Sequence, residues 1–133
     1  IKTRPYEGIL EALAQLREHY PIAIVSNKPD AAVKALCADL FPGLYALGET
    51  ADCPRKPAPD MLYKACREIG VDTCVYVGDS EVDVRTAKNA GVPCLSVLWG
   101  FRDRAEIARE GGCHFCENPR DLPKKIEEIV HGK

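Results

Sequence analysis

The sequence predicts an α/β domain whose mostly parallel sheet carries helices on both faces. Short apolar runs rich in β-branched residues alternate with amphipathic segments of about ten residues, which is the pattern of successive βαβ units. The chain has 133 residues, of which 46% are hydrophobic and 29% charged. That size and composition are typical of one globular domain with its own core.

Three apolar runs predict strands that are buried on both faces. They are Ile22–Val25, Cys74–Val77 and Cys94–Leu98, and Tyr45–Gly48 is a weaker candidate. Continuous apolar runs of this length are expected in a parallel sheet that is covered on both sides. Small polar or acidic residues follow the strands that end at Val25 and Val77, and the ends of these two strands are therefore the first place to look for a site.

The segments between these runs have apolar residues at helical spacing. Helices are predicted over residues 9–16, 30–40, 60–69, 81–89, 103–110 and 122–130. Asp30 is a candidate N-cap for the second of them. Gly70 and Gly91 follow the third and fourth, where glycine commonly ends a helix.

Composition excludes several classes of protein. The charge is 18 − 20 = −2, so the chain lacks the basic excess of a protein that tracks nucleic-acid phosphates. Its apolar runs fall well short of the ~20 residues that span a bilayer. The seven cysteines are an odd number, which argues against a secreted disulfide framework and favours a reducing compartment. We therefore expect a cytoplasmic protein without nucleic-acid or membrane partners.

Cys113 and Cys116 form a C-x-x-C pair that could be half of a zinc site or a redox pair. A matching second half-site is missing from the sequence, because Cys53, His19 and His131 are isolated. Packing or chance is the favoured interpretation of this pair.

Polar residues that suit phosphate lie at or near the predicted strand ends. Ser26 and Asn27 follow the first strand directly, where a hydroxyl and backbone N–H groups can hold an oxyanion, although the pair could simply cap the next helix. Lys56 lies in a Pro-rich loop. It could neutralise a phosphate as a fixed cation, or it could be an ordinary surface lysine.

Asp79 follows the second strand, and Asp83 lies four residues later, one helical turn away. A carboxylate pair at the end of a buried strand suits Mg²⁺, a hard cation that keeps several of its waters. Acidic residues are also favourable at a helix N-terminus without any metal. Both interpretations of the aspartates are compatible with the spacing alone.

Taken in order, these residues resemble three motifs of the haloacid dehalogenase-like hydrolase superfamily, and most closely its phosphoglycolate phosphatase-like branch. The matching motifs are Ser26-Asn27, Lys56-Pro57 and Gly78-Asp79-Ser80-x-x-Asp83, supported by Thr3–Gly8, Ala87-x-x-Ala90-Gly91-Val92-Pro93 and Trp99-Gly100. The order and spacing of the motifs are specific even though each is weak alone. The resemblance implies a Rossmann-like, three-layer α/β/α core.

The resemblance also implies a role for each residue. Ser26 would hydrogen-bond the phosphoryl group with help from the Asn27 amide, and Lys56 would stabilise the nucleophile and the phosphoryl charge. Asp79 would bind Mg²⁺, and Asp83 would be a further metal partner, through water or by orienting the site. The implied reaction is two-step hydrolysis of a small phosphorylated metabolite through an aspartyl-phosphate.

The family's first motif, Asp-x-Asp-x-Thr, is missing from residues 1–133. In the family it ends a central strand between those that here end at Val25 and Val77, and a helical cap follows it. We therefore expect residues 1–133 to be the C-terminal portion of the core domain, inactive alone, with the nucleophilic Asp outside this chain. The alternative is an altered sheet in which the two strands pair directly.

Two other classes of function fit part of the pattern. A receiver-like signalling domain also combines Asp, Ser or Thr, and Lys around Mg²⁺, but in the order acidic residues, Ser/Thr, Lys, which is not the order here. A non-catalytic binding or scaffold protein on the same fold is the stronger alternative, because the nucleophile is not in the sequence. Phosphoglycolate, pyrophosphate, a sugar phosphate and a nucleotide all remain possible substrates, since the family's cap shapes the substrate pocket.

Overall fold

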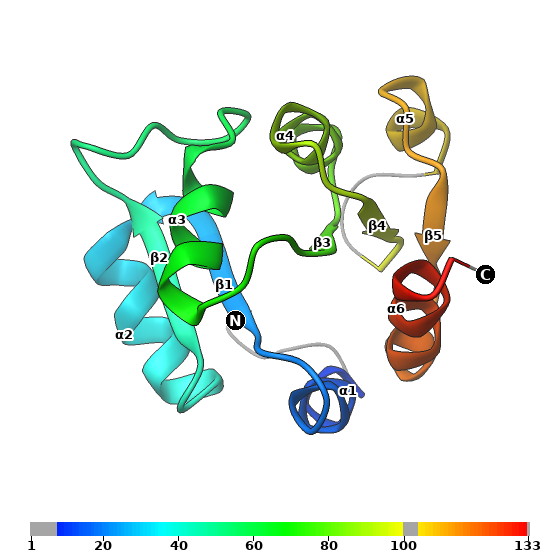
Figure 1. Ribbon diagram of the computed structural model, residues 1–133, viewed down its shortest axis with the longest axis horizontal. Helices are drawn as coiled ribbons and strands as arrows, with labels where there is room; N and C mark the ends of the chain where they lie inside the picture. The colour runs from blue at the N-terminus through cyan, green and yellow to red at the C-terminus, as the bar shows by residue number, and fades with distance from the viewer. Residues whose placement is uncertain (1–7, 100–103, 133) are drawn as a thin grey trace.

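The computed structural model describes residues 8–99 and 104–132 (Figure 1). Helices and strands alternate along these residues as the sequence predicts. In chain order they are α1 (Ile9–Arg17), β1 (Ala23–Pro29), α2 (Asp30–Leu40), β2 (Tyr45–Glu49), α3 (Asp60–Ile69), β3 (Tyr76–Gly78), α4 (Glu81–Ala90), β4 (Cys94–Val97), α5 (Arg104–Arg109), β5 (His114–Cys116), the 3₁₀ turn η1 (Pro119–Asp121) and α6 (Leu122–Val130).

All strand pairs in the two sheets are parallel, but the strands form two separate sheets. β1 pairs with β2 in one sheet, and the other has the order β3-β4-β5. In the described parts of the chain no strand hydrogen-bonds to both β1 and β3, although these two strands face each other across the middle of the molecule (Figure 1). The alternative of direct pairing between them is therefore not what the structure shows.

Helices α3 and α4 cover one face of the strands. Met61 of α3 packs with Leu47 of β2 and with Val25 of β1. Leu62 of α3 and Ala87 of α4 enclose Tyr76 of β3, so these two helices share one apolar cluster. That cluster also touches Val25, and so side chains, not backbone hydrogen bonds, connect the two sheets here.

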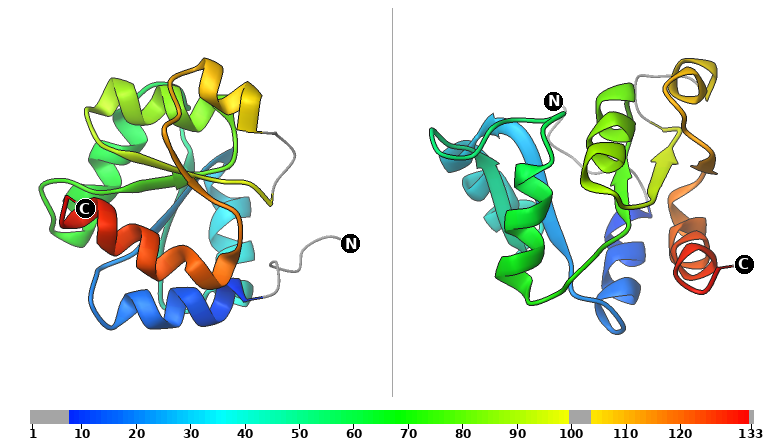
Figure 2. Two further views of the ribbon diagram at one scale, coloured as in Figure 1. Left: turned by 90° about the vertical axis from the view of Figure 1, so that its right-hand side faces the viewer. Right: turned by 45° about the horizontal axis from the view of Figure 1, so that its top comes forward.

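The other face is covered by α2 over the first sheet and by α1 and α6 over the second (Figure 2). Val33 and Cys37 of α2 pack on Ala46 of β2. The cluster under α1 and α6 is the larger one and consists of Ala12, Leu16, Leu95, Val97, Cys116, Leu122 and Ile126. Helices on both faces of parallel strands give the predicted three-layer α/β/α architecture.

Two local expectations differ from the structure. β5 was not predicted, because three residues that include His114 do not give a recognisable apolar run. Asp30 is the first residue of α2 and not its N-cap. Its carboxylate instead accepts hydrogen bonds from the Gly48 amide, at 2.8 Å, and from Lys34, at 2.7 Å. The reason is that Pro29 precedes it in an extended conformation and occupies the cap position.

Three sequence features fall outside the described residues, namely Thr3–Glu7, Gly100 and the start of the predicted helix at Asp103. Within the described ones, every helix is too short or too polar to cross a bilayer.

Candidate active site

Ser26 and Asn27 lie where the pairing of β1 with β2 becomes irregular. Val25 is opposite Leu47, and the next partnered residue of β1 is Pro29, opposite Glu49. The extra residues between them leave the ladder, which frees their side chains for other contacts. The strand thus continues beyond the predicted Ile22–Val25 run but loses its regular register at the two motif residues.

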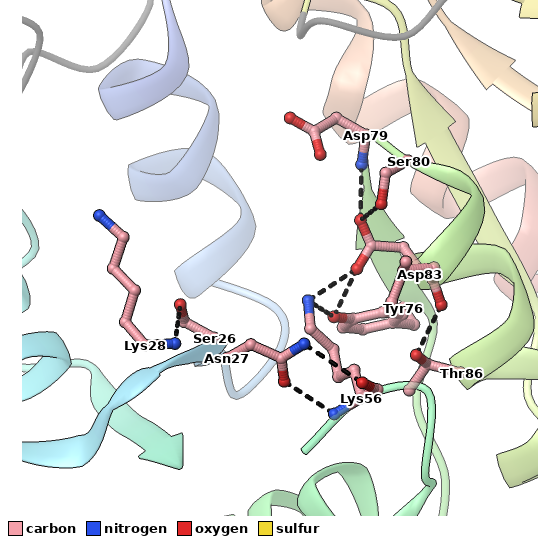
Figure 3. Close-up of polar contacts among 10 residues, drawn as sticks. Ser26, Asn27, Lys28, Lys56, Tyr76, Asp79, Ser80, Asp83 and Thr86 are labelled. Carbon is pink, nitrogen blue, oxygen red and sulfur yellow. Dashed lines mark hydrogen bonds and ion pairs between the residues drawn. The ribbon is translucent and has the colours of Figure 1, made fainter.

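The side chains of this pair take different partners. The Ser26 hydroxyl accepts a hydrogen bond from the Lys28 amide at 3.2 Å, a local turn that serine commonly forms. Asn27 reaches across to the loop before α3, where its Nδ2 donates to the Lys56 carbonyl at 3.2 Å and its Oδ1 accepts from the Lys56 amide at 2.7 Å (Figure 3). Asn27 therefore holds the backbone of Lys56.

The ammonium of Lys56 is directed at the second sheet. Its Nζ lies 2.8 Å from Asp83 Oδ1 and 2.9 Å from the Tyr76 hydroxyl. The Lys56 side chain is only 13% exposed and that of Asp83 7%, so this is a buried ion pair and not the surface lysine that its sequence context also allowed. Lys56 is thus attached to β1 through its backbone and to β3 and α4 through its side chain.

Asp83 lies in the first turn of α4 with both carboxylate oxygens fully used. Oδ1 accepts from Lys56 and, at 3.0 Å, from the Tyr76 hydroxyl, whereas Oδ2 accepts from the Asp79 amide at 3.0 Å and the Ser80 hydroxyl at 3.1 Å. Gly78 makes this position possible, because a Cβ there would overlap the Asp83 side chain. The carboxylate is packed directly against the end of β3.

The charge of Asp83 is stabilised in spite of its burial. Desolvation by itself raises the pKa of this carboxyl, but the ammonium of Lys56 and the hydroxyl of Tyr76 outweigh it, so the pKa lies below its ordinary value. Burial and the neighbouring Asp83 carboxylate raise the pKa of Tyr76 well above its ordinary value. The phenol therefore stays protonated, and its hydroxyl donates a hydrogen bond to Asp83.

Asp79 differs from Asp83 in being exposed. Its backbone amide belongs to the network, while its carboxylate points away from Asp83 and Lys56 (Figure 3). Mg²⁺ binds proteins through one or two carboxylates and keeps several waters, which an exposed carboxylate at a strand end suits. No group of three or more His, Cys, Asp or Glu side chains suited to a metal occurs in residues 8–99 and 104–132.

The structure joins Asn27, Lys56, Asp79 and Asp83 in one network, while the Ser26 hydroxyl bonds within its own turn. Tyr76 also belongs to this network, but the sequence does not single it out, because it lies within the apolar run of a predicted strand. Strand alternation could have located it, since residues two apart point to the same face and Tyr76 is two residues before Gly78.

The two cysteines of the C-x-x-C pair differ in burial. Cys116 is fully buried in the cluster under α1 and α6, and its thiol contacts the Asn118 carbonyl at 3.2 Å, whereas Cys113 is exposed. For Cys116 this agrees with the packing interpretation.

Comparison with known proteins finds the same family that the sequence motifs resemble. Residues 1–91 match the sequence model of the haloacid dehalogenase-like hydrolases. A phosphoglycolate phosphatase of Rhodobacter capsulatus is 39% identical over 103 residues, which are 73% of this chain and 46% of that protein. Another from Mesorhizobium japonicum is 39% identical over 111 residues, which are 77% of this chain and 48% of that protein. The chain thus spans about half the length of the curated relatives that it matches.

A solved structure gives the same result for the fold. A crystal structure of a candidate phosphoglycolate phosphatase from Lactobacillus delbrueckii subsp. bulgaricus superposes with a TM-score of 0.88 at 40% identity, covering 92% of this chain and 54% of that one. The motif order, the three-layer fold and the match over residues 1–91 agree. The chain belongs to the haloacid dehalogenase-like hydrolase family.

Proposed function

We propose that residues 1–133 form the larger part of the core of a Mg²⁺-dependent phosphomonoester hydrolase of the phosphoglycolate phosphatase type. In this proposal a strand from outside the chain lies between β1 and β3 and carries the nucleophilic Asp. We use "the whole protein" for residues 1–133 together with that Asp-bearing segment.

The observation that carries the proposal is the position of Lys56 across the space between the two sheets. Its backbone is bound to Asn27 at the end of β1, and its ammonium to Asp83 beyond the end of β3. The two strands therefore place their carboxyl ends around the same lysine, and neither is hydrogen-bonded to the other. A parallel strand added between them would pair with both and would end beside Lys56.

A carboxylate at the end of that strand would have what phosphoryl transfer needs. Its oxygen attacks phosphorus, the bond from phosphorus to the alcohol oxygen breaks, and the alcohol leaves with a proton given by the second Asp of the Asp-x-Asp motif, which the resemblance implies as general acid. Water then gives a proton back to that second Asp as it attacks phosphorus, the aspartyl–phosphate bond breaks, and inorganic phosphate is released. In this proposal the Lys56 ammonium, with help from the Asn27 backbone N–H, would hold the phosphoryl oxygens, where a fixed positive charge lowers the barrier.

The residues fit a bound Mg²⁺ unequally. Asp79 would hold it, because its carboxylate is exposed and is not used by the network. Asp83 would orient the site instead, since four protein donors already occupy its two oxygens. When bound, the ion would supply positive charge to the phosphoryl oxygens.

The substrate class is argued from the relatives. The proteins from Rhodobacter capsulatus and Mesorhizobium japonicum are named phosphoglycolate phosphatases. Among residues 8–99 and 104–132, Lys56 is the cation that contacts Asp83 and Tyr76, and a single fixed cation suits a substrate with a single phosphate group. A small phosphomonoester such as phosphoglycolate is the substrate we propose.

The test replaces Asp79 in the whole protein. Asp79→Asn removes the carboxylate charge that we assign to Mg²⁺, and we expect hydrolysis of phosphoglycolate to fall at least about 10²-fold at saturating Mg²⁺. The control is Asp72→Asn, an exposed aspartate in the connection before β3, which we expect to retain activity. Unchanged activity in Asp79→Asn would refute the proposed role of Asp79, whereas absence of turnover in the unsubstituted whole protein would favour a non-catalytic protein on the same fold.

A further inference from the structure

Tyr76 is a member of the network to which the proposed chemistry gives no role. It lies on β3, is buried, and forms two polar contacts through one hydroxyl, with Lys56 Nζ at 2.9 Å and with Asp83 Oδ1 at 3.0 Å. The three atoms thus form a closed triangle in which each atom is bonded to the other two (Figure 3).

The hydrogen bonds in this triangle can be counted. The hydroxyl of Tyr76 has one proton, which goes to Asp83, and it accepts from Lys56. The Lys56 ammonium has three protons, of which one goes to Asp83 Oδ1 and one to the Tyr76 oxygen. All four acceptor sites of Asp83 are filled by protein donors. Among the contacts of the described residues, one N–H of Lys56 is therefore left for a ligand.

The triangle also fixes the direction of that N–H. An ammonium held by a single carboxylate can rotate about the line of the ion pair, whereas two fixed acceptors leave one orientation. Tyr76 itself is held by packing, because its ring lies in the cluster formed with Leu62 and Ala87. The Lys56 nitrogen also lies 5.6 Å from the centre of this ring, a weaker attraction that acts on the same cation.

We propose that Tyr76 is a positioning residue, whose hydroxyl aims the one remaining N–H of Lys56 at the transferring phosphoryl group. Tyr76 acts through the lysine and does not itself touch the substrate. This inference rests on the proposed function, because the aimed N–H needs a phosphoryl group to receive it. It assigns a residue outside the family motifs that the sequence matches.

The proposal predicts a specific effect of removing the hydroxyl. Tyr76→Phe keeps the ring, but it leaves Lys56 with one fixed acceptor. The Lys56 ammonium stays in place, but its remaining N–H is no longer aimed at the phosphoryl group. We therefore expect kcat for phosphoglycolate to fall on the order of tenfold, with KM changed less than about threefold. The matched control is Tyr63→Phe, which removes the hydroxyl of an exposed tyrosine that contacts only the Asn89 carbonyl at 3.4 Å in the described contacts.

A second measurement separates positioning from loss of structure. Vanadate resembles the five-coordinate transition state and inorganic phosphate resembles the product, so their inhibition constants report the two states separately. Unfolded molecules lower the total activity, but they do not change the inhibition constant, which reports on the folded molecules alone. We expect Tyr76→Phe to weaken inhibition by vanadate about tenfold and inhibition by phosphate far less, while Tyr63→Phe changes neither.

The possible outcomes separate failure of the Tyr76 proposal from failure of the proposed function. If the unsubstituted whole protein hydrolyses phosphoglycolate and Tyr76→Phe matches it in kcat and in both inhibition constants, the role of Tyr76 is wrong and the proposed function stands. Equal weakening of vanadate and phosphate would also refute positioning, because a loosened site affects both. Absence of turnover in the unsubstituted whole protein would refute the proposed function itself.

Discussion

At the scale of single residues, the site depends on one buried ion pair that the protein stabilises from several sides. Lys56 and Asp83 are 2.8 Å apart, and both side chains are almost completely buried. Removing one partner of such a pair leaves the other charged and buried, which typically costs 3–5 kcal/mol. The proposed chemistry and the stability of the protein therefore depend on the same atoms.

This dependence predicts how stability changes with pH. The folded-state pKa of Asp83 is depressed below the value of about 3.9 found in unfolded chains. The stabilisation is therefore fully present above that unfolded pKa, and it is lost as the pH falls through the lower, folded pKa. We expect the unfolding free energy of the protein to exceed that of Asp83→Asn by about 3 kcal/mol at pH 7.

Urea unfolding between pH 7 and pH 2.5 measures this difference. It should shrink as the pH falls below about 4, because a protonated Asp83 resembles asparagine. The matched control is Asp72→Asn, which should track the unsubstituted protein throughout. A difference between the protein and Asp83→Asn that stays constant down to pH 2.5 would show that the charge of Asp83 does not stabilise the fold.

At the scale of secondary-structure elements, the contact between the end of β3 and the start of α4 determines the site. Gly78 has no space for a side chain, because a Cβ would overlap Asp83. Gly78→Ala should therefore displace the carboxylate, release Lys56 and reduce phosphatase activity of the whole protein by about 10²-fold or more. Steady-state kinetics on the folded variant would measure the loss.

Gly70→Ala is the control for this effect. Gly70 ends α3 with a φ of +78° and has open space around it, so alanine there should cost about 1 kcal/mol of stability through backbone strain alone. Activity below the unfolding transition should be unchanged. If Gly78→Ala and Gly70→Ala lost the same small amount of activity, crowding of Asp83 would not be the reason.

Most elements were predictable because their patterns are local. The apolar spacing of α3 and the glycine at its end are visible in the sequence, and so is the strand that leads to Gly78 and Asp79. β5 was not predictable, because its pairing with β4 and not its own composition makes it a strand. The motif residues of the candidate site are visible in the sequence, whereas the contacts of Asn27 and Tyr76 with Lys56 join positions 29 and 20 residues apart and no local pattern encodes them.

At the scale of the whole molecule, the described residues make a three-layer fold whose strands form two sheets and not one. Lys56 and the cluster around Tyr76 connect the sheets through side chains. Val77 of β3 is apolar and yet 37% exposed, although it belongs to a strand predicted to be buried on both faces. These features agree with a core that is completed by a further strand between β1 and β3.

The measurement that tests this account most directly is Mg²⁺-dependent hydrolysis of phosphoglycolate by residues 1–133, alone and preceded by an Asp-x-Asp-x-Thr segment with its cap from a relative. The account predicts no turnover above the buffer rate for the chain alone. It predicts turnover for the joined protein, lost again when the first Asp of that segment is replaced by Asn. Turnover by residues 1–133 alone, or a joined protein that folds and has no activity, would contradict it.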